Sequence, residues 1–212
     1  MMFSRRMLIA GGLCAGTVGL MLPVVRSRAE NRTSADEWAG KLVAAARSQI
    51  GVTLVYDPSY SKIAFPGGDV PRHKGVCTDV IVRAYRDGLN LDLQALVNAD
   101  MRKTFSAYPK NWDLKTTDSN IDHRRVPNLQ TFFKRRNAEK PVSAEGLSYL
   151  AGDVVTQMLP GNKPHIAIVG DVLSDDGSRP LLIHNIGWGA RMEDILFAFS
   201  VTGHYRYSGQ TS

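Results

Sequence analysis

Three side chains in this sequence have the types needed for covalent hydrolysis: one cysteine and two histidines. Cys77 follows Gly75 and Val76 at the start of a stretch with helical apolar periodicity. His165 opens the apolar run HIAIV, and His184 lies in the next such run, LLIHN. A thiol, a base that takes its proton and a group that orients the base form a nucleophilic triad. The pattern therefore predicts Cys77 as nucleophile, with His165 and His184 supplying the base and the group that orients it.

The expected position of Cys77 at the start of a helix bears on its reactivity. Free backbone N–H groups and the helix dipole favour an anion there, and the thiolate is the nucleophilic form of cysteine. We therefore expect a lowered thiol pKa and rapid alkylation by iodoacetamide near pH 6. The alternative is a small buried core residue, which is common for free cysteine. Either histidine, taken alone, is better explained by a structural role, and the functional prediction depends on the three residues together.

The elements that would position these groups fall into two halves. Up to about residue 136 the apolar residues recur at helical spacing, and after about residue 150 they alternate. Helices are expected at 34–50, 76–88, 91–105 and 126–136, and strands at 52–56, 152–158, 165–171, 181–187 and 199–207. A long loop rich in Pro and Gly occupies 57–75. Helices followed by strands predict an α+β fold, with N-terminal helices and the Cys77 helix packed on an antiparallel sheet.

The two histidine strands are expected to be neighbours. The turn signal DDGS at 175–178 lies between them, which is typical of a hairpin. By strand alternation, His165 shares a face with Ala167 and Val169, and a hairpin can place the imidazole of His184 beside it. Asn185 is the adjacent alternative orienter, but it would point to the opposite face.

The N-terminal segment has the features of an export signal. Arg5 and Arg6 precede an apolar, glycine-rich run, and Ser27-Arg28-Ala29 is a small-x-small cleavage pattern. We interpret residues 1–29 as a twin-arginine-like signal peptide and 30–212 as a single domain, exported to the periplasm or an equivalent space. An uncleaved membrane anchor is the alternative, and no stable membrane insertion is expected after cleavage.

The charge balance argues against a nucleic-acid partner. The full chain has a net charge of +6, but cleavage after Ala29 would remove four of its 26 basic residues and none of its 20 acidic ones, leaving +2. No basic patch interleaved with aromatic residues is present. The mature chain would keep Cys77 as its one cysteine, so it could form no internal disulfide in an oxidising compartment.

The order of these motifs resembles that of the NlpC-like cysteine peptidases. GVCTDVIVRAY, AGDVVTQM, PHIAIVGD and LLIHNIG follow the order of a Cys-bearing helix, a Gly-Asp-leading strand, a His-initiated strand and a second His-bearing strand. Residues 56–207 also resemble a bacterial domain-of-unknown-function family in that superfamily, through YDPSY, FPGGDVP, GVCTD, IDHRRVPNL and HNIGWGA. Val-Cys-Thr-Asp replaces the usual Asp-Cys-Ser-Gly around the nucleophile.

The resemblance implies a papain-like fold and hydrolysis of amide bonds in peptidoglycan peptides. By matching position it implies Cys77 as nucleophile, His165 as base and His184 as orienter. No cofactor is expected, and the sequence does not indicate an oligomeric state. Further residues are candidates for substrate binding: Tyr56, Asp79, His123, Arg124, Arg125, Asn185 and Trp188. The arginines could pair with peptide carboxylates, although a solvated loop is the alternative.

Two other functions use the same residues. Cys77, His165 and His184 could hold zinc with water in the fourth position, although no recognised zinc spacing supports this. The same fold could instead bind wall peptides or a protein partner without turnover. The sequence leaves these readings open beside the thiol hydrolase.

Overall fold

The computed structural model describes residues 37–209, and the predicted signal peptide lies outside them. Four helices occupy 37–47, α2 (Cys77–Leu89), α3 (Leu93–Lys103) and α4 (Val126–Arg135). Short 3-10 turns form η1 (Phe105–Ala107), η2 (Asp122–Arg124) and η3 (Gly146–Ser148). Pro127 lies in the first turn of α4, where its missing N–H has no helical partner to lose.

The strands of the second half form one antiparallel sheet of six strands in the order β3-β8-β4-β5-β6-β7. They are β3 (Glu139–Lys140), β4 (Val154–Leu159), β5 (Lys163–Leu173), β6 (Pro180–His184), β7 (Arg191–Glu193) and β8 (Ser200–Tyr205). A separate parallel pair joins β1 (Val55–Tyr56) to β2 (Lys74–Gly75). The fold is therefore α+β with an antiparallel sheet, as the sequence predicts.

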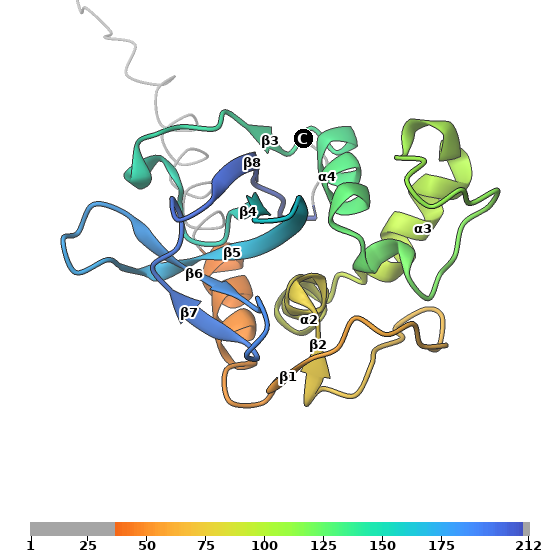
Figure 1. Ribbon diagram of the computed structural model, residues 1–212, viewed down its shortest axis with the longest axis horizontal. Helices are drawn as coiled ribbons and strands as arrows, with labels where there is room; N and C mark the ends of the chain where they lie inside the picture. The colour runs from red at the N-terminus through yellow and green to blue at the C-terminus, as the bar shows by residue number, and fades with distance from the viewer. Residues whose placement is uncertain (1–36, 210–212) are drawn as a thin grey trace, which may run out of the picture. The chain divides into compact units, whose positions relative to one another are not determined.

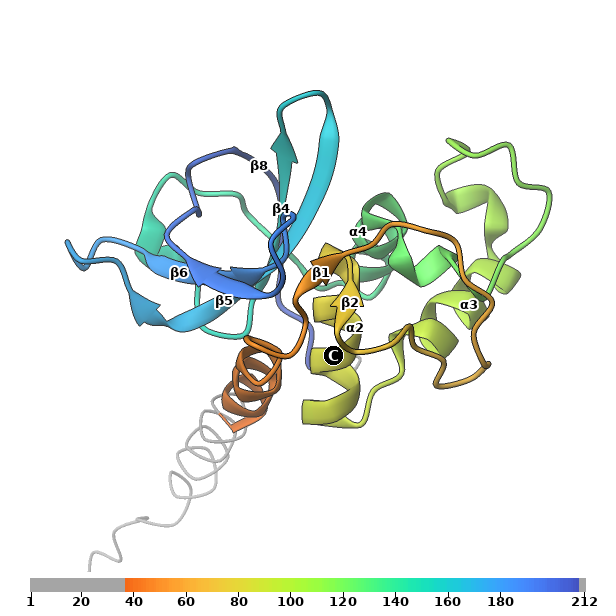
Figure 2. The same cartoon turned by 60° about the horizontal axis from the view of Figure 1, so that its bottom comes forward.

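Both faces of the central strands are buried, and each face serves a different core. Ile166 and Ile168 of β5 pack in the cluster that contains Cys77 and the apolar side of α2. Ala167 and Val169 pack in a second cluster on the other face. Alternation along β5 produces this division, because successive side chains point to opposite faces. In Figures 1 and 2, α2 and α4 both lie beside the sheet, and α3 lies on their far side.

The structure differs from the sequence expectation mainly at the ends of elements. The predicted strand 181–187 ends at His184, and the side chain of the next residue, Asn185, bonds to the backbone of Gly75 and Gly187. Strands β2, β3 and β7 were not expected, and β2 lies at the end of the predicted loop 57–75, since two or three residues carry too little alternation to be recognised. No helix within residues 37–209 is long and apolar enough to cross a membrane.

Candidate active site

The first turn of α2 is fixed by a buried ion pair rather than by a capping hydroxyl. Asp79 Oδ2 accepts a hydrogen bond of 2.6 Å from the backbone N–H of Val76, just before Cys77. The same carboxylate receives two bonds from Arg124 of η2, from Nε at 2.8 Å and from Nη2 at 2.9 Å. The Thr78 hydroxyl donates to the Arg124 carbonyl oxygen at 3.0 Å. These bonds hold the Cys77 end of α2 against η2.

Gly75 is required by this arrangement. A Cβ at this position would lie 2.8 Å from Asp79 Oδ2, which is too close for a normal contact. Its carbonyl oxygen also accepts a 3.1 Å hydrogen bond from Asn185 Nδ2, so the segment before Cys77 is tied to the end of β6. The glycine before the cysteine therefore allows the helix start to pack tightly between η2 and the sheet.

The Cys77 thiol lies against the backbone of β5 at Ile166, the residue that follows His165. Only 5% of Cys77 is exposed. Burial raises the pKa of the thiol to about 12, and the nearby carboxylate of Asp79 acts in the same direction. The backbone N–H of Ile166 and the N–H groups of Thr78 and Cys77 point at the sulfur and oppose this rise. The expectation of a lowered pKa is wrong, because burial outweighs the helix terminus.

The raised pKa of Cys77 predicts slow alkylation of the native protein. At pH 7.5 we expect iodoacetamide to modify Cys77 at least about 100-fold more slowly than an ordinary exposed thiol, because the thiolate is scarce and enclosed. The rate should rise with pH up to about 12. Mass analysis of the Cys77 peptide over time measures it, with the urea-unfolded protein as reference. Rapid modification near pH 6 would show instead a thiolate paired with a protonated histidine.

The two histidine rings meet on adjacent strands. The ring centroids of His165 and His184 are 5.2 Å apart, and the rings are nearly perpendicular at 86°. Both side chains are buried. Burial, together with the neighbouring His184, lowers the pKa of His165 to about 3. His165 is therefore neutral at pH 7 and can accept a proton.

His184 has its own acidic neighbour. Its Nε2 lies 3.0 Å from Glu193 Oε2 on β7. Burial lowers the pKa of His184, while Glu193 acts in the opposite direction. The antiparallel pairing of β6 with β7 brings this carboxylate to the histidine, since His184 is paired with Arg191, which lies two residues before Glu193. The structure thus forms a row of His165, His184 and Glu193.

Buried neutral histidines predict a loss of stability in acid. The pKa of His165 is about 3 in the folded protein, against about 6.5 for an unfolded histidine. The unfolded state therefore binds more protons than the folded state below pH 6.5. As a result, the free energy of unfolding decreases as the pH is lowered. For His165 we expect a loss of up to about 2 kcal/mol between pH 6.5 and 5.

Urea unfolding of wild type and His165→Gln at pH 7.5, 6.5 and 5 measures this contribution. The variant should lose less stability over the same range, because it lacks the titrating group. The difference between the two proteins removes the opposing effect of Asp122, whose pKa is raised to about 6 by burial. Parallel curves for the two proteins would show that His165 does not titrate between the folded and unfolded states.

A cavity of about 200 Å³ opens at Cys77, and we call it the Cys77 cavity. Tyr56, Arg124 and Arg125 line it together with the cysteine, and Pro164 brings β5 to its wall beside His165. Burial raises the pKa of Tyr56 to about 12, and Cys77 and Asp79 raise it further. The structure thus brings four of the residues singled out in the sequence to one cavity, although they are spread over 70 positions of the chain.

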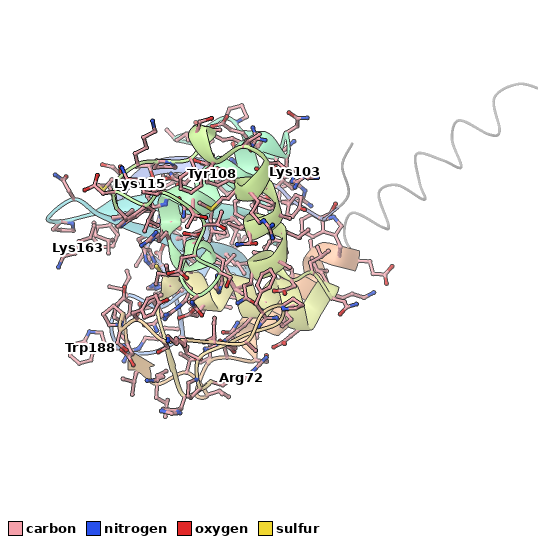
Figure 3. All side chains as sticks on the ribbon, turned by 90° about the vertical axis from the view of Figure 1, so that its right-hand side faces the viewer. Arg72, Lys103, Tyr108, Lys115, Lys163 and Trp188 are labelled. Carbon is pink, nitrogen blue, oxygen red and sulfur yellow. The ribbon has the colours of Figure 1, made fainter. Side chains whose placement is uncertain are left out.

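The remaining substrate-binding candidates lie elsewhere. Asp79 is occupied by Arg124 and the Val76 N–H, so its place is structural. Asn185 is buried and holds Gly75 and Gly187, which leaves it unsuited to orient His165. His123 is buried in η2, its Nδ1 has no hydrogen-bond partner in residues 37–209, and burial lowers its pKa to about 4. Trp188 is 79% exposed and projects from the ribbon in Figure 3.

Two contributors to the site carry no clear signal in the sequence. Trp112 lines the Cys77 cavity, and the guanidinium of Arg125 lies 4.1 Å from its ring centroid, a cation–π contact. In the sequence, Trp112 is recognisable only as an aromatic residue within the polar stretch between α3 and η2. Glu193 approaches His184 through a three-residue strand that was not predicted.

The proposed zinc ligands do not form a metal site. Within residues 37–209 no group of three or more His, Cys, Asp or Glu side chains is arranged to hold a metal ion. Cys77 faces the backbone of Ile166 on β5, while His184 is directed to Glu193. The three side chains therefore do not converge on one point.

Comparison with known proteins identifies the family. The model of a family described as "Domain of unknown function (DUF1287)" matches residues 43–207, a range that includes every residue of the candidate site. The "Uncharacterized protein YijF" of Escherichia coli (strain K12) is 53% identical over 162 residues, which cover 76% of this chain and 78% of that protein. The chain therefore belongs to the DUF1287 family.

Proposed function

We propose that this protein is an exported cysteine hydrolase that cleaves amide bonds in peptidoglycan peptides. The observation that carries the proposal is the position of the Cys77 thiol, at the start of α2, on the wall of a cavity and against the β5 backbone at Ile166, the residue after neutral His165. The motif order resembles that of NlpC-like, papain-like peptidases, and this resemblance supports the substrate class. The N-terminal signal pattern supports the extracytoplasmic location.

In the proposed dyad the thiol and the imidazole both rest in the neutral form, since the pKa of Cys77 is raised and that of His165 is lowered. Substrate binding in the Cys77 cavity places an amide carbonyl carbon at the sulfur. The sulfur forms a bond to this carbon while the thiol proton passes to His165, so the thiolate never accumulates. The carbonyl oxygen becomes an oxyanion, and the backbone N–H groups at the start of α2 stabilise it.

The remaining steps return the enzyme to its starting state. The imidazolium of His165 gives its proton to the leaving amine as the carbon–nitrogen bond breaks, which leaves a thioester on Cys77. Water then attacks this thioester while His165 takes one of its protons. The carbon–sulfur bond breaks, the product leaves as a carboxylic acid, and His165 returns the proton to the sulfur of Cys77. His184 acts as a positioning residue, because its ring packs edge-on against His165 and its Nε2 faces Glu193.

Arg124 and Arg125 suit substrates that carry carboxylates. Both line the Cys77 cavity, but they differ in freedom. Arg124 is committed to Asp79 through two hydrogen bonds, whereas Arg125 makes one long contact of 3.4 Å with Asp122 and stacks on Trp112. Arg125 is therefore the arginine that can turn to a substrate carboxylate.

Mass analysis of material released from purified sacculi tests the proposal. The expected products are peptides with one added water for each bond cut, and intact glycan strands. Their masses identify the bond. Equal release by wild type and by Cys77→Ala would contradict the proposal.

The deep burial of Cys77 favours a second candidate, a module that binds wall peptides without cleaving them. A buried thiol of raised pKa is also what an inert core cysteine would have. Under this reading a peptide would bind with the same affinity to wild type and Cys77→Ala, and no product would form with either. Calorimetric titration with a soluble wall peptide, combined with product analysis, separates the two functions.

A further inference from the structure

A second and larger cavity lies on the α3 side of the molecule, away from Cys77. Its volume is about 500 Å³, within the range of roughly 300–1,000 Å³ typical of small-molecule sites. Its walls come from α3, from the loop between β1 and β2, and from the segment that follows α3. We call it the Lys115 cavity. Nothing in the hydrolase proposal uses it.

The charge of the Lys115 cavity is entirely positive. Arg102 of α3 and Lys115 are the two ionisable side chains in its lining. Neither forms an ion pair within residues 37–209, in contrast to Arg135 and Arg136, which pair with Asp100. Two cations left without partners at one cavity favour an anionic ligand.

Uncharged polar groups in the lining also lack partners. Asn98 is 7% exposed and lines the cavity, yet its side chain makes no hydrogen bond within the described part of the chain. Its amide atoms are not among the solvent-excluded polar atoms that lack partners, so they remain accessible for hydrogen bonds to a ligand in the cavity. The hydroxyls of Thr116, Thr117 and Ser119 lie in the same lining and make no hydrogen bonds to other residues in 37–209.

Two phenylalanine rings complete the lining. Phe65 comes from the loop before β2, and Phe105 comes from η1. Flat apolar rings among hydroxyl and amide groups suit a ligand with alternating C–H faces and hydroxyl edges, which is the surface of a sugar ring. An anionic group on that ring would meet Arg102 and Lys115.

The walls are held in place by one buried side chain. Gln94 of α3 donates from Nε2 to the carbonyl oxygens of Ala64 at 2.9 Å and Ser119 at 3.0 Å, and its Oε1 accepts from the Gly68 N–H at 2.9 Å. It therefore joins all three segments that line the cavity. Walls fixed in this way lower the entropic cost of binding.

We propose that the Lys115 cavity binds a saccharide that carries a carboxylate or a phosphate group. The site does not depend on Cys77, so the proposal stands or falls separately from the hydrolase. A slot of about 10 Å³ lies between the two cavities: Phe105 lines the slot and the Lys115 cavity, and Trp112 and Arg125 line the slot and the Cys77 cavity.

Titration of the purified protein with three related sugars tests the proposal. N-acetylmuramic acid carries a carboxylate, N-acetylglucosamine 6-phosphate carries a phosphate, and N-acetylglucosamine is the neutral reference with the same ring. We expect at least one of the anionic sugars to bind at least tenfold more tightly than the neutral one, and the tighter of the two identifies the group. Amide shifts in NMR spectra should centre on residues 98–105 and 115–119.

Variants that each remove one positive charge from the Lys115 cavity show which side chains contribute to sugar binding. Arg102→Gln and Lys115→Gln should each weaken binding of the preferred sugar by roughly three- to tenfold and should reduce its advantage over the neutral sugar. Lys103→Gln is the matched control, because Lys103 is an exposed neighbour on α3 that does not line the cavity. Figure 3 shows Lys103 and Lys115 near the same end of this face, away from Trp188.

Three results would overturn the proposal: equal affinity for the three sugars, shifts confined to other regions, or an equal effect of the Lys103 control. The wild-type shift map decides the location even if a variant is unstable. Binding by Cys77→Ala should match wild type. Sugar binding without hydrolysis, or hydrolysis without sugar binding, would show which of the two proposals has failed.

Discussion

Replacing Cys77 with alanine should lower the rate of peptide release from sacculi by at least about 10³-fold. Among the described residues, Cys77 carries the only thiol that lines the Cys77 cavity. Neutral His165 follows Pro164, the residue through which β5 reaches the same cavity. Alanine removes the attacking atom but keeps the backbone N–H groups at the start of α2. Binding of a wall peptide should therefore persist while turnover is lost.

A graded series makes this result specific to the mechanism. His165→Ala should cost about 10²- to 10⁴-fold, because it removes the group that moves the proton. His184→Ala should cost less, since His184 only positions His165. Lys41→Ala, on the exposed side of the first helix, is the matched control and should retain full activity. Unfolding curves should place Cys77→Ala within about 1 kcal/mol of wild type. Equal losses in all three site variants, with lowered stability, would indicate misfolding instead.

Replacing Asp79 with alanine should lower the free energy of unfolding by about 3–5 kcal/mol. The side chains of Asp79 and Arg124 are 4% and 2% exposed, and two hydrogen bonds join them. Removal of the carboxylate leaves the Arg124 guanidinium buried without a counter-charge. It also leaves the N–H of Val76 without its 2.6 Å bond, which loosens the first turn of α2.

Urea unfolding of Asp79→Ala and Arg124→Met, singly and together, measures the coupling. The double variant should lose less stability than the two single variants lose in sum. Each single substitution leaves one unpaired buried charge, whereas the double substitution removes both charges. Lys134→Ala is the matched control: it breaks an exposed 3.0 Å pair with Glu139 and should cost less than about 1 kcal/mol. If Asp79→Ala unfolds like this control, the pair does not hold the start of α2.

The Asp79–Arg124 pair also links stability to the candidate site. Arg124 lines the Cys77 cavity while its guanidinium is bound to the turn that carries the thiol. A variant that breaks the pair should therefore lose activity together with stability, even though neither side chain takes part in the proposed proton transfers. Asp79 and Arg124, predicted as substrate contacts, are better understood as the support of the nucleophile.

The sequence alone determined the α+β fold and the order of its elements. Helical periodicity before residue 136 and alternation after residue 150 are local properties, and the elements form where these patterns lie. The same patterns put Cys77 at the start of a helix and His165 and His184 on neighbouring strands, and all three lie where the sequence indicates. The short strands β3 and β7 were not predicted from the sequence, since they form only through pairing with longer neighbouring strands.

Only the tertiary structure decided how reactive and how free each group is. The start of a helix favours a thiolate, but the depth of burial raises the pKa of Cys77 instead, and burial depends on every element packed around it. Likewise, a sequence cannot show that Asp79 is occupied by an arginine 45 positions away, that Asn185 holds Gly75, or that Glu193 reaches His184. Polar side chains act through their partners, and distant segments supply those partners only after the chain has folded.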